Sequence, residues 1–375
     1  MSMAHTKKED SSLKNLEDIF LHGVRLQRSG ILKKFWRLRR IGWQALRSRS
    51  RRTHMLRKEG LIVPAAIGFS PTMRCNLSCI GCYARDYPQG NELPLDAIEA
   101  LLDSGEDLGI FLFVITGGEP LMREGIVETF RRHKRLLFLL VTNGTLVDGK
   151  RAQAIARSRN IVPVVSLEGL REQTDARRGS GVYDQVELAM RHLQDEGAVF
   201  GFSATVARDN FRTLSSDEFI DTMIERGCAV GYYTEYIPVG SAARWELVLE
   251  DGEREHFRER VLELRRDKPI MVVHLPDDEY MSDGRCRALV YGSVHINAQG
   301  YVEPCPFCHF ASDTVGEKSL REALRSPFLA EIRSSKSIIR TGQLGCALFE
   351  NRKLVQDIAG KTGAQRTDCS LIAKD

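Results

Sequence analysis

Three closely spaced cysteines are the residues of this 375-residue chain best suited to chemistry. Cys75, Cys79 and Cys82 form a C-x3-C-x2-C pattern, and Tyr83 directly follows the third cysteine. Four thiolates close the coordination sphere of a structural zinc ion, whereas three leave one position unfilled. On a cubane iron–sulfur cluster, three thiolates leave one iron free to bind a small molecule. The spacing alone is compatible with either metal.

A second group of cysteines lies in the last third of the chain. It comprises Cys286, Cys305, Cys308 and Cys346, with Cys369 further on. Short spacings, in a chain without a visible signal peptide, indicate metal ligation in a reducing compartment rather than disulfides. We therefore expect a cytoplasmic protein. Cys228 stands apart from both groups and is interpreted as a small buried hydrophobe.

Apolar runs predict the strands that position the first cysteines. Between residues 62 and 238, such runs alternate with amphipathic stretches of helical periodicity. Strands are expected near 64–70, 110–115, 136–141, 161–166, 199–206 and 230–236, and helices near 93–107, 123–133, 149–158, 183–197 and 215–227. This alternation predicts a parallel sheet with right-handed crossovers. The three thiols then leave the C-terminal end of the first strand, where α/β barrels place their chemistry.

Three further loops follow the second, third and fourth predicted strands. They read Thr116-Gly117-Gly118-Glu119-Pro120, Thr142-Asn143-Gly144-Thr145 and Ser166-Leu167-Glu168-Gly169. Together with the thiol motif, and in this order, they resemble the radical S-adenosylmethionine (SAM) superfamily. The resemblance implies a partial (β/α)6 TIM-like barrel, open on one side to admit a large substrate.

The chemistry implied by this resemblance is reductive cleavage of SAM. Cys75, Cys79 and Cys82 would ligate a [4Fe–4S] cluster whose fourth iron binds the amino and carboxylate groups of SAM. Cleavage gives methionine and a 5′-deoxyadenosyl radical, which abstracts hydrogen from an unactivated C–H bond. An electron donor such as flavodoxin or ferredoxin is implied as a partner.

The same resemblance suggests SAM contacts. Gly117 and Gly118 would let the backbone approach the methionyl group, and Glu119 would accept a hydrogen bond from its ammonium. Alternatively, the glycines only form a turn and Glu119 lies at the surface. The other candidates are Tyr83 and Val206 near the adenine, Pro120 beside Glu119, Asn143 and Ser166 for backbone and ribose contacts, Arg178 for the carboxylate, and Tyr236 facing the substrate. Asn143 and Ser166 have purely structural alternatives, and Arg178 could equally be a solvated charge at a helix end.

A hairpin introduces the second cysteine group. Residues 292–305 predict two short arms joined by a turn at Ala298-Gln299-Gly300. This segment resembles the SPASM or shorter twitch extension of radical SAM enzymes, which holds an auxiliary cluster. The resemblance implies a second [4Fe–4S] cluster on Cys286, Cys305, Cys308 and Cys346. A zinc site, or Cys369 in place of one ligand, remains an alternative. A helix is expected over residues 319–333.

Residues 1–60 carry a strong positive charge. They contain 16 Lys and Arg against 5 Asp and Glu, a net charge of +11, so the remainder carries −7 of the total of +4. Apolar residues at helical spacing predict one helix from Leu13 and a second that bears Trp36 and Trp43. This basic amphipathic helix either packs on the barrel or lies on an anionic membrane through residues 31–58. Nucleic-acid binding is disfavoured because no helix-turn-helix or RNA-binding pattern accompanies the basic run.

These observations divide the chain into five parts. We expect a basic helical segment over residues 1–60, the core barrel over 61–240, a helical linker over 241–282, the iron–sulfur extension over 283–350 and a tail over 351–375. No apolar run reaches the roughly 18 residues needed to span a bilayer. Three functions remain open: an enzyme acting on a hydrophobic or membrane-associated substrate, a peptide-modifying maturase, and a non-enzymatic iron–sulfur or zinc module.

Overall fold

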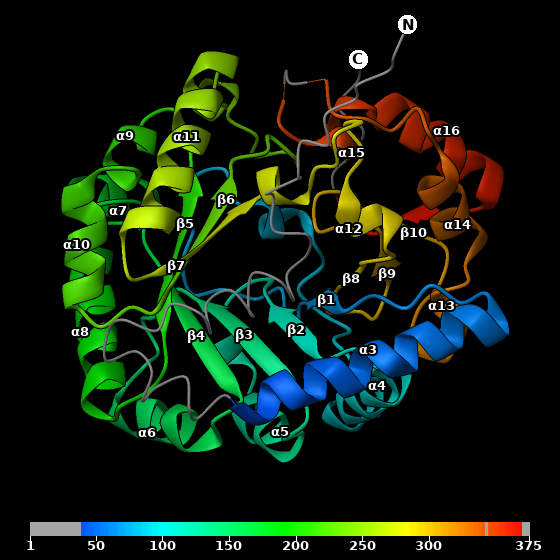
Figure 1. The fold of residues 1–375 in the computed structure, drawn as a ribbon, viewed down its shortest axis with the longest axis horizontal. Helices are drawn as coiled ribbons and strands as arrows, with labels where there is room; N and C mark the ends of the chain where they lie inside the picture. Colours follow the sequence, from blue (N-terminus) through cyan, green and yellow to red (C-terminus); the bar gives the residue numbers. More distant parts are fainter. Residues whose placement is uncertain (1–38, 342–343, 370–375) are drawn as a thin grey trace, which may run out of the picture.

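The computed structural model describes residues 39–341 and 344–369, and its centre is a curved parallel sheet (Figure 1). Its strands are β1 Ala66–Phe69, β2 Leu112–Ile115, β3 Leu137–Thr142, β4 Ile161–Ser166, β5 Gly201–Val206, β6 Val230–Glu235, β7 Met271–Leu275, β8 His295–Ile296 and β9 Val302–Glu303. Their order is β7-β6-β5-β4-β3-β2-β1-β8-β9. Strands β1 to β7 are parallel, so the partial barrel and its six predicted strands are confirmed.

Helices cover the outside of the sheet (Figure 1). They are α4 Leu95–Leu108, α5 Ile126–Arg132, α6 Gly149–Ser158, α7 Arg171–Arg178, α8 Val182–Asp195, α9 Phe211–Leu214, α10 Asp217–Glu225 and α11 Asp251–Asp267. Local signals set their ends: Asp148 and Ser216 cap the amides of Arg151 and Phe219, and Gly109 ends α4 in the left-handed region. Fully buried phenylalanines such as Phe113 and Phe138 fill the space between helices and sheet. The five predicted helices are present.

The segment 241–282, expected as a helical linker, also contains a strand. β7 follows α11 and pairs in parallel with β6, so this segment extends the sheet by a seventh parallel strand. Its apolar run is only five residues long and follows a highly charged helix, which masked it in the sequence. The link between barrel and extension is therefore part of the barrel.

The hairpin of β8 and β9 joins the opposite edge of the same sheet. β8 runs parallel to β1 and antiparallel to β9, and the turn between them reaches Gly300 at φ +89°. The predicted hairpin is therefore present, but its attachment to β1 was not foreseen. Because side-chain alternation does not identify a partner strand, this pairing leaves no local signal in the sequence.

The C-terminal elements, coloured yellow to red in Figure 1, lie beside β1; most of them form a second, smaller core, whereas Leu320 and Ala323 pack in the main core. The elements are α12 Arg287–Val290, β10 Phe310–Ala311, α13 Leu320–Ala323, α14 Pro327–Ser334, α15 Ala347–Glu350, α16 Arg352–Thr362 and β11 Gln365–Arg366. The single helix expected over 319–333 is wrong, because Pro327 starts a new helix capped by Ser326. The expected tail likewise contains α16 and β11, and Val355 and Ile358 are buried in the smaller core.

Helix α3 (Arg39–Glu59) lies along α4. Arg51 and Arg52 donate to the carbonyl oxygens of Glu106 and Gly109 at 2.8 and 2.7 Å. Glu59 pairs with arginines of the C-terminal elements. The described part of the basic helix thus packs on the barrel. The predicted helix from Leu13 and the side chains of both tryptophans lie outside the described residues. In the described part, no helix is long and apolar enough to cross a membrane.

Candidate functional site

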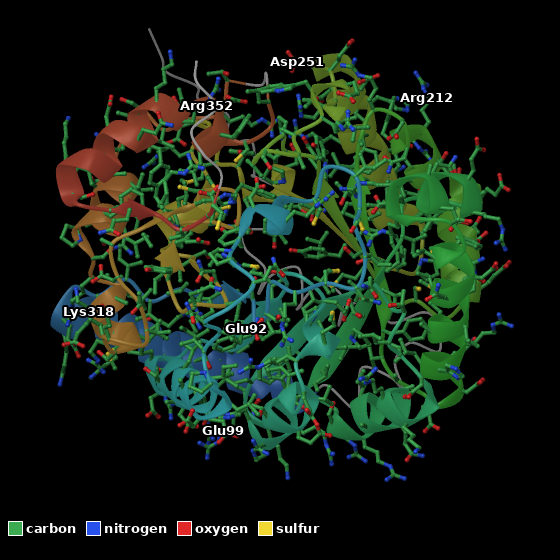
Figure 2. All side chains as sticks on the ribbon, turned by 180° about the vertical axis from the view of Figure 1, so that it is seen from behind. Glu92, Glu99, Arg212, Asp251, Lys318 and Arg352 are labelled. Carbon is green, nitrogen blue, oxygen red and sulfur yellow. The ribbon has the colours of Figure 1, made fainter. Side chains whose placement is uncertain are left out.

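The first three cysteines lie on the loop that leaves β1, which we call the thiol loop (residues 70–82). All three are free thiols; Cys75 is exposed and the other two are partly buried. Arg74 pairs with Glu92 at 3.1 Å, and Thr72 also hydrogen-bonds to that carboxylate. Glu92, which receives both contacts, is labelled in the view from behind in Figure 2. The loop is therefore fixed at the C-terminal edge of the sheet, as predicted.

Gly117 and Gly118 allow close approach, but to the thiol loop itself. The amide of Gly118 donates to the Thr72 carbonyl at 3.0 Å. A Cβ placed on Gly118 would lie 2.1 Å from the Arg74 carbonyl oxygen, and one on Gly117 would lie 2.5 Å from that of Thr72. Gly117 also adopts φ +104°, which favours glycine. The double glycine thus seats the backbone that carries the cysteines.

Glu119 is completely buried, so the interpretation as a surface residue is wrong. Its carboxylate accepts from the Leu121 amide at 3.0 Å, the Thr142 hydroxyl at 2.7 Å and the Asn143 amide at 2.7 Å. Burial raises the pKa of this carboxyl, and these hydrogen bonds oppose that rise. Glu119 therefore ties the loop after β2 to the loop after β3. Pro120 is buried at the start of the short 3₁₀ helix η2 Pro120–Met122.

Asn143 directly contacts a cysteine of the thiol loop. Its Nδ2 lies 3.8 Å from the Cys75 sulfur and donates to Asn76 Oδ1 at 2.9 Å. The Leu77 amide lies 3.5 Å from the same sulfur. Donors to sulfur stabilise a thiolate ligand and adjust the potential of a cluster.

A buried carboxylate holds two arginines beside the other two cysteines. Glu168, on the loop after β4, lies 2.8 Å from a guanidinium nitrogen of Arg177 and 2.5 Å from one of Arg178. Although burial alone would lower it, the pKa of Arg178 is raised by Glu168 and by the thiols of Cys79 and Cys82. Arg178 is therefore not a solvated helix-end charge. Sequence reasoning assigned no role to Arg177 or Glu168, because neither charge reveals its burial in the sequence.

Arg177 and Arg178 also affect the pKa of a neighbouring cysteine. Burial raises the pKa of the Cys75 and Cys82 thiols, whereas Arg177 and Arg178 lower that of Cys82. In addition, the Arg177 carbonyl accepts from the Ile80 amide of the thiol loop, and Arg177 Nε donates to the Ile80 carbonyl. The positive charge thus lies where cluster thiolates would be negative.

The remaining SAM-contact candidates lie around the same edge. Ser166 ends β4 and pairs in register with Ser203. Val206 and Tyr236 are buried, with exposed fractions of 0% and 4%. A Cβ on Gly81 would lie 2.7 Å from the Tyr236 ring, so that tyrosine packs against the thiol loop. Contacts of these residues with SAM remain predictions.

Tyr83 faces the C-terminal extension. It opens the 3₁₀ helix η1 Tyr83–Asp86, and its ring lies edge-on to Tyr87 and Phe307, with centroids 6.5 and 6.0 Å apart. Burial raises its pKa to about 12, while hydrogen bonds with Thr116 and Gly117 oppose the rise. Its expected place beside the adenine remains a prediction, but its ring clearly joins the two cysteine regions.

The structure brings the second cysteine group together in the small core. Its members are Cys286, Cys305, Cys308 and Cys346. Burial raises the pKa of Cys286 to about 12 and of Cys346 to about 11, and the pKa values of Cys286, Cys305 and Cys308 are raised further by the Cys346 thiol. Within residues 39–341 and 344–369, no three His, Cys, Asp or Glu side chains are arranged to hold a single metal ion.

The other two cysteines lie elsewhere. The Cys369 amide donates to the Asp86 carbonyl at 2.6 Å, which places this exposed cysteine at η1. Cys228 is 3% exposed within the main core, as expected for a small hydrophobe.

Comparison with known proteins identifies the family. A family model described as "Radical SAM superfamily" matches residues 69–223. The AdoMet-dependent heme synthase of Nitratidesulfovibrio vulgaris is 33% identical over 310 residues, which cover 74% of this chain and 83% of that protein. The chain belongs to the radical SAM superfamily. It is therefore an enzyme of a family that uses a [4Fe–4S] cluster and SAM, and the non-enzymatic interpretation is wrong.

Other proteins to which this radical SAM enzyme is similar are named for different molecules. The Fe-coproporphyrin III synthase of Methanosarcina barkeri is 32% identical over 223 residues, covering 57% of this chain but only 54% of that protein. SuiB of Streptococcus suis, solved with S-adenosylmethionine, has a TM-score of 0.65 at 20% identity and covers 85% of this chain and 83% of its own. A second SuiB structure, bound to the precursor peptide SuiA, also scores 0.65 at 19% identity, covering 82% of this chain and 75% of its own. At these identities the structural likeness shows the fold alone.

Proposed function

We propose that Cys75, Cys79 and Cys82 hold the SAM-binding [4Fe–4S] cluster. The donor set supports this assignment: three free thiols share one loop, and Asn143 and Arg178 bring a donor and a positive charge to them. When bound, the cluster and SAM supply a radical able to abstract hydrogen from an unactivated C–H bond. This chain's own residues fix the thiol loop at the edge of the sheet.

The four cysteines of the extension are proposed to hold an auxiliary [4Fe–4S] cluster. Thiols packed together in a small core are costly to ionise, as their raised pKa values indicate, so bound iron would compensate their charge. Cys305 and Cys308 approach each other through an isolated β-bridge, which holds two of the ligands in a tight turn. Cys369 is not needed for this set.

Iron content tests both assignments. Anaerobically reconstituted protein should hold about eight irons if both clusters are cubanes. Replacing Cys75, Cys79 and Cys82 by Ala should leave about four irons, and so should replacing Cys286 and Cys346 by Ala. Cys369→Ser is the matched control and should keep the full content. An unchanged iron content in the first triple variant would contradict the SAM-cluster assignment.

For the substrate, we propose a planar tetrapyrrole of the class of heme and its precursors. The observation that carries this is the match to a heme synthase along most of both chains. The side chains near both cysteine groups are also aromatic. Tyr232 on β6 is 8% exposed, and burial raises its pKa, with Glu279, Tyr83 and Cys305 adding to the rise. Flat aromatic side chains suit a flat apolar ring.

The experiment uses Fe-coproporphyrin III as the probe. Binding should shift its visible absorption band and, with dithionite and SAM, increase formation of 5′-deoxyadenosine. Tyr232→Leu should weaken the probe's affinity by about tenfold, the scale of one aromatic contact. Tyr291→Leu, at a tyrosine that is 55% exposed, is the matched control. No spectral shift and no stimulated cleavage would reject the tetrapyrrole.

A peptide-modifying maturase is the alternative function. It is favoured by the fold likeness to SuiB, whose precursor peptide is present in one structure. Genomic neighbourhood separates the two functions, because a short precursor gene beside this one would favour a peptide, and tetrapyrrole genes would favour the ring.

We also propose that the exposed side of α3 contacts an anionic membrane. Leu46 and Leu56 are 56% and 52% exposed there, beside exposed basic residues such as Arg49 and Arg57. Each basic residue near an anionic surface contributes about 1 kcal/mol. Sedimentation with anionic vesicles should therefore show salt-sensitive binding that neutral vesicles lack. Equal binding by a variant with Arg49 and Arg57 changed to Gln would contradict this contact.

A further inference from the structure

A carboxylate, an imidazole and a hydroxyl form a fully buried chain where the hairpin meets β1. Glu303 Oε2 lies 2.6 Å from His295 Nδ1, and His295 Nε2 lies 2.7 Å from Ser70 Oγ. All three residues are 0% exposed. The parallel pairing of β1 with β8, which sets Gly68 opposite His295, brings the ring to the start of the thiol loop.

This arrangement is not a hydrolytic triad. The same three groups activate a serine nucleophile in hydrolases, but there the serine must meet its substrate. Because Ser70 has no exposed surface, no substrate can reach its hydroxyl. The hydrogen-bonded series must therefore act through the residues that surround it.

The hydrogen bonds around Glu303 determine which atom donates and which accepts at each step of this hydrogen-bonded series. Its carboxylate accepts from the Tyr87 hydroxyl at 3.0 Å, from Asn297 Nδ2 at 3.1 Å and from the Thr367 hydroxyl. An ionised carboxylate only accepts, so His295 donates from Nδ1. In the neutral ring, Nε2 then accepts from the Ser70 hydroxyl.

The same order of donors and acceptors continues from Ser70 toward the proposed SAM site. With its own hydrogen committed to His295, its oxygen accepts from the Thr116 hydroxyl 3.3 Å away. The Thr116 amide donates to the Phe69 carbonyl at 2.9 Å, and the next residue, Gly117, packs so closely that a Cβ on it would lie 2.8 Å from Ser70 Cβ. We call this series of hydrogen bonds the Ser70 relay; its members are Glu303, His295, Ser70 and Thr116.

We propose that the Ser70 relay is a positioning device through which the C-terminal extension fixes the start of the thiol loop against the loop after β2 and so sets the geometry for SAM binding. Two members, His295 and Glu303, come from the extension, whereas the others flank the thiol loop. The relay deepens the proposed function and rests on its assignment of the SAM cluster to Cys75, Cys79 and Cys82.

Two isosteric or near-isosteric changes test the relay. Ser70→Ala and Thr116→Val each remove one hydroxyl from it, whereas Thr116→Ser keeps the hydroxyl. Thr367→Val is the matched control, because it removes a donor from the same Glu303 outside the relay. Loss of one positioned hydrogen bond should weaken SAM binding to the reconstituted protein by about tenfold. It should also alter the change that SAM causes in the electron paramagnetic resonance signal of the reduced cluster.

The control separates positioning from mere stability. We expect Thr116→Ser to regain the wild-type signal, and Thr367→Val to keep it despite a lowered unfolding midpoint. In apoprotein, amide hydrogen exchange over residues 74–83 should be faster in Ser70→Ala and Thr116→Val but not in Thr367→Val. Wild-type SAM affinity and exchange in the two relay variants, or equal losses in the control, would overturn the relay. If the wild-type protein formed no SAM-binding cluster, the proposed function would fail, and exchange in apoprotein would still decide the relay.

Discussion

Gly118→Ala should displace the thiol loop without disturbing the sheet. The new Cβ would lie 2.1 Å from the Arg74 carbonyl oxygen and 2.6 Å from that of Met73. Both obstructing atoms belong to the backbone, so no side-chain rotation relieves the contact. Since real Cβ contacts are rarely under 3.0 Å, the loop must move by about 1 Å. That shift weakens the hydrogen bonds from the amides of Gly118 and Glu119 to the loop, which are 3.0 and 2.8 Å long.

The cost follows from those two bonds. At about 0.5–1.5 kcal/mol each, their loss removes roughly 1–3 kcal/mol of loop stability. We expect a lower SAM affinity by one to two orders of magnitude and a loss of cluster iron on gel filtration. Isothermal titration with SAM and iron analysis measure both.

Gly149→Ala is the matched control for this change. Gly149 is the first residue of α6, and a Cβ added there would meet no neighbouring atom within 4 Å. This variant should be neutral or more stable by up to about 1 kcal/mol. If Gly118→Ala kept wild-type SAM affinity and iron, the close contact between the two loops would not matter for the site.

Two further changes probe carboxyl groups whose pKa is raised. In Glu119→Gln the amide NH₂ must face a backbone donor, so urea unfolding of the apoprotein should show a loss of about 1–3 kcal/mol, and an unchanged midpoint would refute this. Burial, with Asp278 adding to it, raises the pKa of Glu279 to about 7. Because the folded state then holds its proton more tightly than the unfolded state, the stabilisation is complete below about pH 4 and is lost as the pH rises through 7, by up to about 3 kcal/mol. Unfolding of apoprotein at pH 5 and pH 8 should show this fall in the wild type and a smaller one in Glu279→Gln; identical pH profiles would refute it.

The local parts of the fold were well predicted from the sequence. Strands and helices with their own hydrophobic period, such as β3 and α6, were found at nearly their full lengths. Pro327 was a visible signal that the helix expected over 319–333 would be interrupted, and the apolar run of β7 was also present but short. By contrast, the pairing of β8 with β1 depends on contacts between residues more than 200 positions apart, which periodicity does not encode.

The candidate site was predictable where spacing alone defines it. Cysteine spacing located both thiol groups, but nothing local indicated that Glu119 would be satisfied by protein donors or that the Arg178 side chain would be only 11% exposed. Those properties depend on which loops meet at the edge of the sheet. His295 and Glu303 look like ordinary hairpin residues until β8 pairs with β1, so the relay could not be read from the chain.

The extension contacts the barrel toward both ends of its sheet, at β1 and at β6. At one end, β8 extends the sheet beside β1 and sends His295 to Ser70. At the other, Glu235 of β6 pairs with Arg254 of α11 at 2.8 Å, and Gly345 packs against that carboxylate, where a Cβ would lie only 2.7 Å from it. Gly345 directly precedes Cys346, so this thiol of the extension is held near β6. The hairpin, by contrast, is held against β1. A half-barrel open along one side could otherwise flex between its edge strands. Closing it through a buried hydrogen-bonded hairpin at one end and a close packing contact at the other would fix the two thiol groups relative to each other, as a substrate held between them requires.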